Sequence, residues 1–195
     1  MRSSIAIGVL LFLLLVLFGV GGCSYNKLVD KEEKVRSQWA QVENAYQRRA
    51  DLIPNLVNTV KGAANFEKET LTAVMNARAS ATQTKLSADN LTEENLKAFQ
   101  QAQAGVSSAL SRLLVSVEAY PDLKANQNFR DLMNELAGSE NRISVERKRF
   151  NDLVQDYNRQ VRSFPANMMA GIFGFEQKAY FEAKEGTELP PEVKF

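Results

Sequence analysis

The fold is decided by residues 25–61, which read YNKLVDKEEKVRSQWAQVENAYQRRADLIPNLVNTVK. One set of positions in this stretch recurs in steps of three and four. These positions are Val35, Trp39, Val42, Tyr46, Arg49, Ile53, Leu56 and Val60. Such spacing keeps a single stripe of a helix facing its neighbour, as in a left-handed bundle or a coiled coil. The stretch therefore predicts one long amphipathic helix.

Two residues depart from the simple stripe. Arg49 places a charge on the line that should be buried, and Pro54 lies inside the helix. Proline has no amide to donate to the carbonyl four residues earlier, which here belongs to Ala50. We therefore expect a bend or a widened turn between residues 50 and 54.

The rest of the chain predicts three further helices. Residues 66–84 form the second, residues 86–91 a loop, and Thr92 the N-cap of a third helix that Pro121 ends. A fourth helix spans about residues 126–164, with a flexible point at Gly138 and Ser139. Ala, Leu, Glu, Gln, Arg and Lys dominate these stretches, and connections are short. The predicted fold is all-α: an N-terminal membrane segment followed by an elongated antiparallel four-helix bundle.

Composition excludes several classes of chemistry. The formal net charge is +1, which gives no indication of nucleic-acid binding. The chain has no histidine and a single cysteine, Cys23, so His-based triads, zinc sites and internal disulfides are excluded. We expect no cofactor, no metal and no enzymatic reaction. An enzyme that uses the carboxylates of Glu118 or Glu140 is a weaker hypothesis, because no convergent site surrounds them.

Residues 5–22 form an uncharged run that ends VLFGVGGC. One interpretation is a transmembrane helix near the lower length limit. Another is a secretory signal peptide, in which Val20 to Cys23 resemble a lipobox and Cys23 is lipidated. The predicted domains are residues 1–23 as anchor or lipoprotein signal, 24–184 as the helical domain and 185–195 as a tail.

The two interpretations place the domain on opposite sides of the membrane. The positive-inside rule favours the cytoplasm, because Lys27, Lys31, Lys34 and Arg36 outnumber Arg2. A lipidated Cys23 instead requires export. The sequence predicts attachment to a membrane and leaves the side open.

Charged residues on or near the apolar stripes define a candidate site. They are Arg49, Arg78, Glu118, Glu140 and Arg142. A buried binding site or switch is one interpretation. The favoured one is an internal network in which Arg49 or Arg78 pairs with Glu118 or Glu140 and fixes the register between helices, because removing one partner of a buried pair costs about 3 to 5 kcal/mol.

The C-terminal segment GIFGFEQKAYFEA is rich in apolar and aromatic residues. Its candidate contact residues are Ile172, Phe173, Phe175, Tyr180 and Phe181. In an up-down-up-down bundle the fourth helix returns toward the membrane, so this segment lies near the bilayer surface. It could cap the open end of the bundle, or it could contact lipid or a partner.

Several motifs resemble the LemA family of bacterial membrane-anchored helical proteins. They are YNKLV and SQWAQVENAYQRRADLIPNLVNTVKG, then ARAS, VEAYPDLKAN, FRDLMNEL, SENRI and FGFEQKAYFEA. The resemblance implies a membrane-tethered four-helix domain with no established reaction and no catalytic residues. One branch of the family is associated with magnetosome membranes, and members tend to accompany membrane proteases.

Two functions are expected from these features together. The first is a non-enzymatic scaffold or adaptor of the cell envelope that acts through protein–protein contacts. Its partners would be membrane lipid and an envelope protein, with a membrane protease and further copies of the chain as candidates. The second is a membrane-shaping or lipid-binding protein that uses the anchor and the C-terminal aromatic segment.

Overall fold

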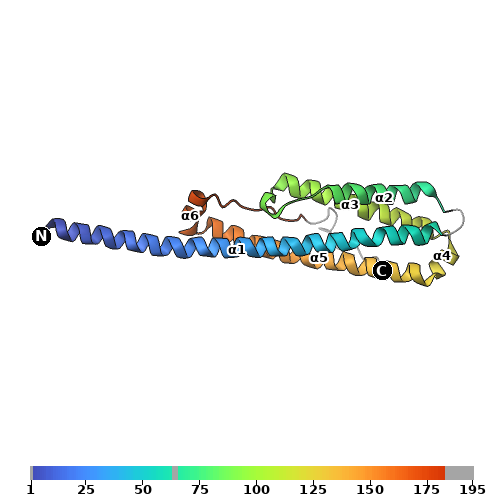
Figure 1. Cartoon of the computed structure of the whole chain (residues 1–195), viewed down its shortest axis with the longest axis horizontal. Coiled ribbons are helices and arrows are strands. Elements are labelled where there is room, and N and C mark those ends of the chain that lie inside the picture. The colour runs from blue at the N-terminus through green and yellow to red at the C-terminus, as the bar shows by residue number, and fades with distance from the viewer. Residues whose placement is uncertain (1, 63–65, 183–195) are drawn as a thin grey trace, which may run out of the picture.

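A computed structural model describes residues 2–62 and 66–182, with side chains from residue 22 onward. The described residues are all-α, as predicted, and contain no strand. They form six α-helices and one short 3-10 helix, arranged as a long rod (Figure 1). The elements are α1 (Arg2–Lys61), α2 (Lys68–Gln83), η1 (Ala88–Asn90), α3 (Glu93–Val117), α4 (Pro121–Ala125), α5 (Gln127–Arg162) and α6 (Ala166–Phe173).

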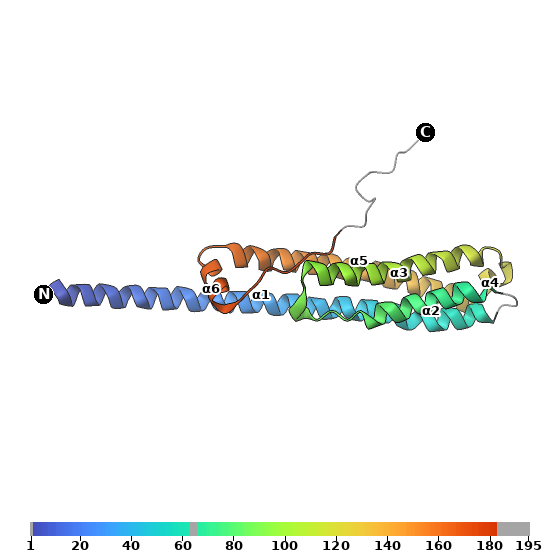
Figure 2. The ribbon, with the colours of Figure 1, turned by 90° about the horizontal axis from the view of Figure 1, so that it is seen from above.

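The four long helices α1, α2, α3 and α5 run antiparallel to their chain neighbours (Figures 1 and 2). Helix α1 packs chiefly against α5 along the rod, and α2 packs against α3 and α1. Two short helices were not predicted. Pro121 occupies the first turn of α4 rather than merely ending the third helix, a position where its missing amide is harmless. Helix α6 follows α5 at the other end.

Helix α1 is continuous over 60 residues. The predicted anchor, residues 1–23, includes the first part of α1, and its side chains are described only for residues 22 and 23. Among the residues whose side chains the structure describes, none of the helices combines the length and the apolar character needed to cross a membrane. The predicted tail, residues 185–195, also lies outside the described residues.

The predicted widened turn at Pro54 is absent, because α1 remains α-helical through this residue. The carbonyl of Ala50, which Pro54 leaves without an amide donor, accepts a hydrogen bond of 2.7 Å from Nε of Arg78 on α2. A side chain from the neighbouring helix thus replaces the lost backbone bond.

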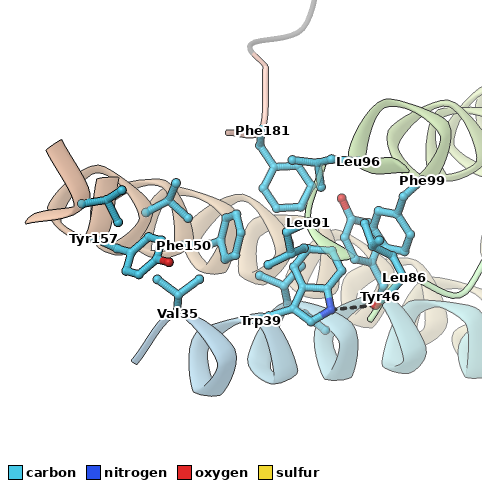
Figure 3. Close-up of a cluster of buried hydrophobic side chains, with 14 of the residues drawn as sticks. Val35, Trp39, Tyr46, Leu86, Leu91, Leu96, Phe99, Phe150, Tyr157 and Phe181 are labelled. Carbon is cyan, nitrogen blue, oxygen red and sulfur yellow. Dashed lines mark hydrogen bonds between the residues drawn. The ribbon is translucent and has the colours of Figure 1, made fainter. Parts of the chain in front are cut away.

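The core consists of two buried clusters along the rod. One fills the half distal to the N-terminus, between α1, α2, α3 and α5. The other centres on Trp39, whose ring lies 5.4 Å from both Phe99 and Phe150 (Figure 3). The indole Nε1 of Trp39 donates to the carbonyl of Leu86 over 2.9 Å, so the α2–α3 connection is fixed to α1.

Side-chain caps define two helix starts. The hydroxyl of Thr92 accepts from the amide of Asn95, which confirms the predicted N-cap of α3. The side chain of Asn126 caps α5 in the same way, accepting from the amide of Phe129. Helix α5 continues unbroken through Gly138 and Ser139.

Candidate functional site

Arg49 is the centre of a polar cluster inside the rod. Its side chain is only 3% exposed. Its Nη1 lies 2.6 Å from Oε1 of Glu140 on α5 and donates to Oγ of Ser107 on α3 over 3.1 Å. Its Nη2 donates to Gln103 on α3, to Oε1 over 2.6 Å and to the backbone carbonyl over 3.2 Å. One guanidinium therefore links three helices.

The other members of the predicted network lie elsewhere. Arg78 bonds the carbonyl of Ala50 and no carboxylate in the described structure. Glu118, at the C-terminal end of α3, is exposed and pairs with Lys124 over 2.7 Å. Arg142 is exposed. It lies two residues beyond Glu140, and two residues turn a helix by more than half a circle. Glu118 and Arg142 therefore do not belong to the Arg49 cluster.

Two open hollows flank this cluster. A hollow of about 310 Å³ lies toward α2, and one of about 510 Å³ lies between α3 and α5. Both are lined by Tyr46, Arg49 and Gln103, which separate them. Burial raises the pKa of the Tyr46 hydroxyl, although the positive charges of Arg147 and Arg49 oppose this shift. Among the described residues, no group of three or more Cys, Asp or Glu side chains is placed to bind a metal ion.

The sequence analysis did not identify one buried carboxylate, Glu146 on α5. Glu146 is 5% exposed and accepts a 2.7 Å hydrogen bond from Nε2 of Gln38 on α1. Arg149 lies 3.3 Å from its other oxygen. The spacing of Glu146, three residues from Ile143 and four from Phe150, places it on the buried stripe of α5, and this signal could have identified it.

After α6 the chain reverses at Gly174, whose φ of 74° lies in the left-handed region that glycine adopts without strain. Residues 175–182 then run back along the rod as an extended segment, here called the strap (Figure 2). Two asparagines of α5 hold the strap. Asn158 bonds the carbonyl and amide of Lys178 at 2.8 and 2.9 Å, and Asn151 bonds those of Phe181 at 3.0 and 2.9 Å.

The spacing of these bonds follows from backbone geometry. Seven helical residues separate the two asparagines, a rise of about 10.5 Å at 1.5 Å per residue. Three extended residues separate Lys178 from Phe181, a span of about 10 Å. The two distances are nearly equal, so the carboxamides of Asn151 and Asn158 can each bond the amide and the carbonyl of one strap residue. Lys178 adds an ion pair of 2.9 Å with Glu32 on α1.

The strap divides the predicted C-terminal contact residues into two groups. Phe181 is buried and stacks on Trp39 at 5.9 Å, so it belongs to the core (Figure 3). Phe175 is half-buried, and the Tyr180 hydroxyl accepts from Asn158. Ile172 and Phe173 remain exposed on α6. The capping interpretation therefore fits the strap, and the contact interpretation is left to α6.

The candidate lipidation site, Cys23, has an exposed free thiol. It lies inside α1, one residue before Ser24, which is already buried in the rod. The packed domain therefore begins directly after the cysteine, with no intervening linker.

Comparison with known proteins agrees with the resemblance found in the motifs. The model of the LemA family matches residues 38–195. The chain belongs to the LemA family. The match includes the Arg49 cluster, both asparagines and the strap, whereas Cys23 and the run 5–22 precede it.

Three relatives show how this LemA-family chain compares with others. Magnetosome proteins MamQ 1 and MamQ 2 of Paramagnetospirillum magneticum are each 27% identical over 183 residues, covering 85% of this chain and 67% of the relative. Protein LemA of Metamycoplasma hominis is 23% identical over 160 residues, covering 82% of this chain and 69% of the relative. These names denote no enzymatic activity.

Proposed function

We propose that this chain is a non-enzymatic scaffold or adaptor of the bacterial cell envelope, anchored to a membrane and acting through protein–protein contacts. The observation that carries the proposal is the continuity of α1 from Arg2 to Lys61. At 1.5 Å per residue, the 37 positions from residue 25 onward extend about 55 Å beyond the apolar run 5–22. An anchor in this run would hold a stiff rod out from the bilayer.

The hollow between α3 and α5 is the surface proposed for a partner. Its walls include Lys97, Gln100 and Gln101 on one side and Arg147 on the other. Helix α3 packs on α2 and makes few contacts with α5, so this side of the rod is open. The lining also includes Glu140 and Glu182, so charges of both signs stand beside several amides. Such a lining suits a polar segment of a partner that carries complementary charges. The kinship with magnetosome proteins supports a role in organising a membrane-bound assembly.

Photo-crosslinking in cells tests the partner surface. A photoreactive amino acid would replace Gln101 or Ala104, which line the hollow, or Gln155, which is exposed on α5 away from it. We expect discrete crosslinked species from the first two positions and none from the third. Absence of adducts from both positions in the hollow would contradict the assignment of the partner surface.

Anchoring is tested separately by fractionation. The full chain should sediment with membranes and resist alkaline extraction, whereas residues 24–195 expressed alone should not. The mass of the mature N-terminus distinguishes the two modes of attachment. A diacylated Cys23 indicates export and lipidation, and an N-terminus at Met1 or Arg2 indicates an uncleaved helix. Recovery of the full chain in the soluble fraction would refute the anchored scaffold.

A second function, membrane shaping or lipid binding, is favoured by one specific observation, the apolar outer face of α6.

A further inference from the structure

Helix α6 lies on the surface of the rod but turns large apolar side chains outward, the opposite of an ordinary surface helix. The fully buried side chains of α6 are small, Ala166 and Ala170, and Met169 packs partly buried beside them. The other large apolar side chains face outward. Met168 is 53% exposed, Ile172 70% and Phe173 57%, and Phe164 just before the helix is 81% exposed. No charged residue occurs in ANMMAGIF. A surface helix normally turns its polar face outward, so this face requires an occupant.

The other large exposed apolar residues of the described chain do not form such a face. Val115 on α3, Val145 on α5 and Met75 on α2 belong to three different helices. Tyr180 is a single exposed ring on the strap, and Tyr25 lies against α6 itself. Single exposed residues of this kind are ordinary. The clustering on and beside α6 is therefore a local property of this end of the rod.

The position of α6 identifies the occupant. Its last residue, Phe173, contacts Tyr25 of α1 with ring centroids 4.8 Å apart, and Phe175 contacts the same ring at 5.7 Å. Tyr25 lies three residues after Gly22, the end of the apolar run, which is a rise of about 4.5 Å along α1. The polar headgroup layer on each side of a bilayer is about 5 to 7 Å thick. If the run fills the hydrocarbon core, Tyr25 and Phe173 lie within the headgroup layer.

The chain leaves no slack that would move α6 away from this layer. Ser24 and Leu28 are already buried in the rod, and α1 is helical throughout. Both views show α6 at the end of the folded rod from which the N-terminal part of α1 projects (Figures 1 and 2). Either mode of anchoring, through the run itself or through a lipid on Cys23, therefore holds α6 at the membrane surface.

Exposed positive charges accompany the apolar face. Arg159 and Arg162 are exposed in the last turn of α5, which leads directly into α6, and Lys27 is exposed two residues after Tyr25. Basic side chains at this depth are attracted to anionic headgroups, each by about 1 kcal/mol. Apolar residues flanked by basic ones are typical of segments that lie in a membrane interface.

We propose that the outer face of α6, with Phe164, Met168, Ile172 and Phe173, inserts into the headgroup layer of the bilayer that anchors the chain. This second contact fixes the tilt of the rod relative to the membrane. The proposal rests on the anchor of the proposed function and adds the surface that contacts lipid. An anchor alone leaves a helix free to tilt, whereas two contacts at one end define a direction.

The test uses the full chain in vesicles of phosphatidylcholine and phosphatidylglycerol. The mass of the mature N-terminus decides the background. A diacylated Cys23 is kept, because the lipid already blocks its thiol, and an unmodified Cys23 is replaced by serine, because the run 5–22 is then the anchor. In this background, Ile172→Cys carries an environment-sensitive fluorophore. Val115→Cys is the matched control, because Val115 is as exposed (73%) but lies on α3. We expect the label at residue 172 to show a blue-shifted emission. Quenchers attached to the lipid headgroups should lower its intensity. The label at residue 115 should show the emission of a water-exposed fluorophore, and its intensity should not change when the quenchers are present.

A substitution provides the complementary measurement. Phe164→Ser combined with Ile172→Ser should abolish quenching of a label introduced by Met168→Cys, while the protein still floats with the vesicles. Phe173 is kept, because its ring holds α6 against Tyr25. Both substituted residues are exposed, so helicity measured by circular dichroism should not change.

The outcomes separate the two proposals. Failure of the full chain to float with vesicles would contradict the anchor. Flotation with residue 172 as water-exposed as residue 115 would overturn the α6 contact alone. The label at residue 172 could instead be shielded from water but not quenched by lipid-borne quenchers, with the shielding increasing as more protein is added per vesicle. This result would assign the outer face of α6 to a contact with a second copy or another protein, and it would also overturn the lipid contact.

Discussion

Replacing Arg49 with methionine should lower the free energy of unfolding of the rod by about 2 kcal/mol. Methionine retains the length and apolar packing of the arginine stem but removes all four hydrogen bonds of the guanidinium. The choice of methionine therefore separates the polar contribution from the loss of volume that alanine would add.

The magnitude follows from what each partner can do afterwards. The two bonds to Gln103 lie in the buried part of the cluster, and each contributes about 1 kcal/mol. The side chain of Glu140 is 39% exposed, so water can replace part of its interaction with Arg49. Ser107 is also only partly buried, so water can replace Arg49 at its hydroxyl. The ion pair and the bond to Ser107 together therefore add about 1 kcal/mol rather than the 3 to 5 kcal/mol of a fully buried pair. Methionine recovers about 1 kcal/mol, because it carries no charge to desolvate.

Denaturant unfolding of the full chain in a mild detergent measures this change. Trp39 is the only tryptophan and is buried in the core, so its fluorescence reports on the rod. A loss of 2 kcal/mol should lower the melting temperature by about 4 to 8 °C for a domain of this size. The matched control is Arg142→Met, an exposed arginine two residues from Glu140, which should change stability by less than about 0.5 kcal/mol.

A double-mutant cycle of Arg49→Met with Glu140→Gln isolates the pair, with an expected coupling energy of about 1 kcal/mol. Unchanged stability in Arg49→Met would refute the assignment of Arg49 as a link between three helices. If Arg49→Met alone is strongly destabilising but the coupling energy with Glu140→Gln is near zero, the lost stability comes from the bonds of Arg49 to Gln103 and Ser107 instead.

Three other contacts give predictions of their own. Arg78→Met should lower the free energy of unfolding by about 1 to 2 kcal/mol, because the carbonyl of Ala50, which has no amide donor at Pro54, then loses the donor on Arg78 as well. Adding Pro54→Ala supplies an amide and should restore that stability in chemical denaturation. If stability does not recover, the Arg78 bond does not replace the lost backbone bond. Tyr157 is fully buried with no hydrogen-bond partner for its hydroxyl among the described residues, so Tyr157→Phe should stabilise the rod by about 1 kcal/mol. Burial, reinforced by negative charges nearby, raises the pKa of Tyr157 above its ordinary value. The unfolded chain therefore releases this proton above about pH 10 while the folded chain retains it, so the fold loses stability as pH rises beyond that point. The phenylalanine variant should lose less stability in an alkaline titration, and identical pH profiles would contradict this account. Phe181→Ala should cost about 2 to 4 kcal/mol and red-shift the emission of Trp39, on which Phe181 stacks, and an unchanged spectrum would show that the strap does not close the core.

The helices could be predicted because their signals are local. The three-four repeat from Val35 to Val60 requires only the helical period, and the cap at Thr92 requires only residues within one turn of it. Arg49 could also be identified as a buried charge from its place in the repeat. Its partner could not, because Glu118 and Glu140 are equally acidic in sequence and only the packing of α5 beside α1 selects Glu140.

Other features of the candidate sites depend on contacts between distant segments. The sequence of the strap shows neither a helical nor an alternating period, so no local pattern predicts its conformation. Its extended backbone is instead held by side chains of α5 about twenty to thirty residues away. The continuity of α1 through Pro54 likewise depends on Arg78 from another helix. The prediction was a bend or a widened turn, and the widened turn is absent because Arg78, which lies outside α1, supplies the missing donor.

The sequence by itself determined that this protein is all-α, that its long helices carry continuous buried stripes, that an apolar run precedes them, and that its motifs belong to the LemA family. Only the tertiary structure decided which aromatic residues of the C-terminal segment are buried and which face outward. The physical reason is that helical periodicity is written in neighbouring residues, whereas the exposure of Phe181 and Ile172 depends on where a reversal at Gly174 places each of them against α1 and α5.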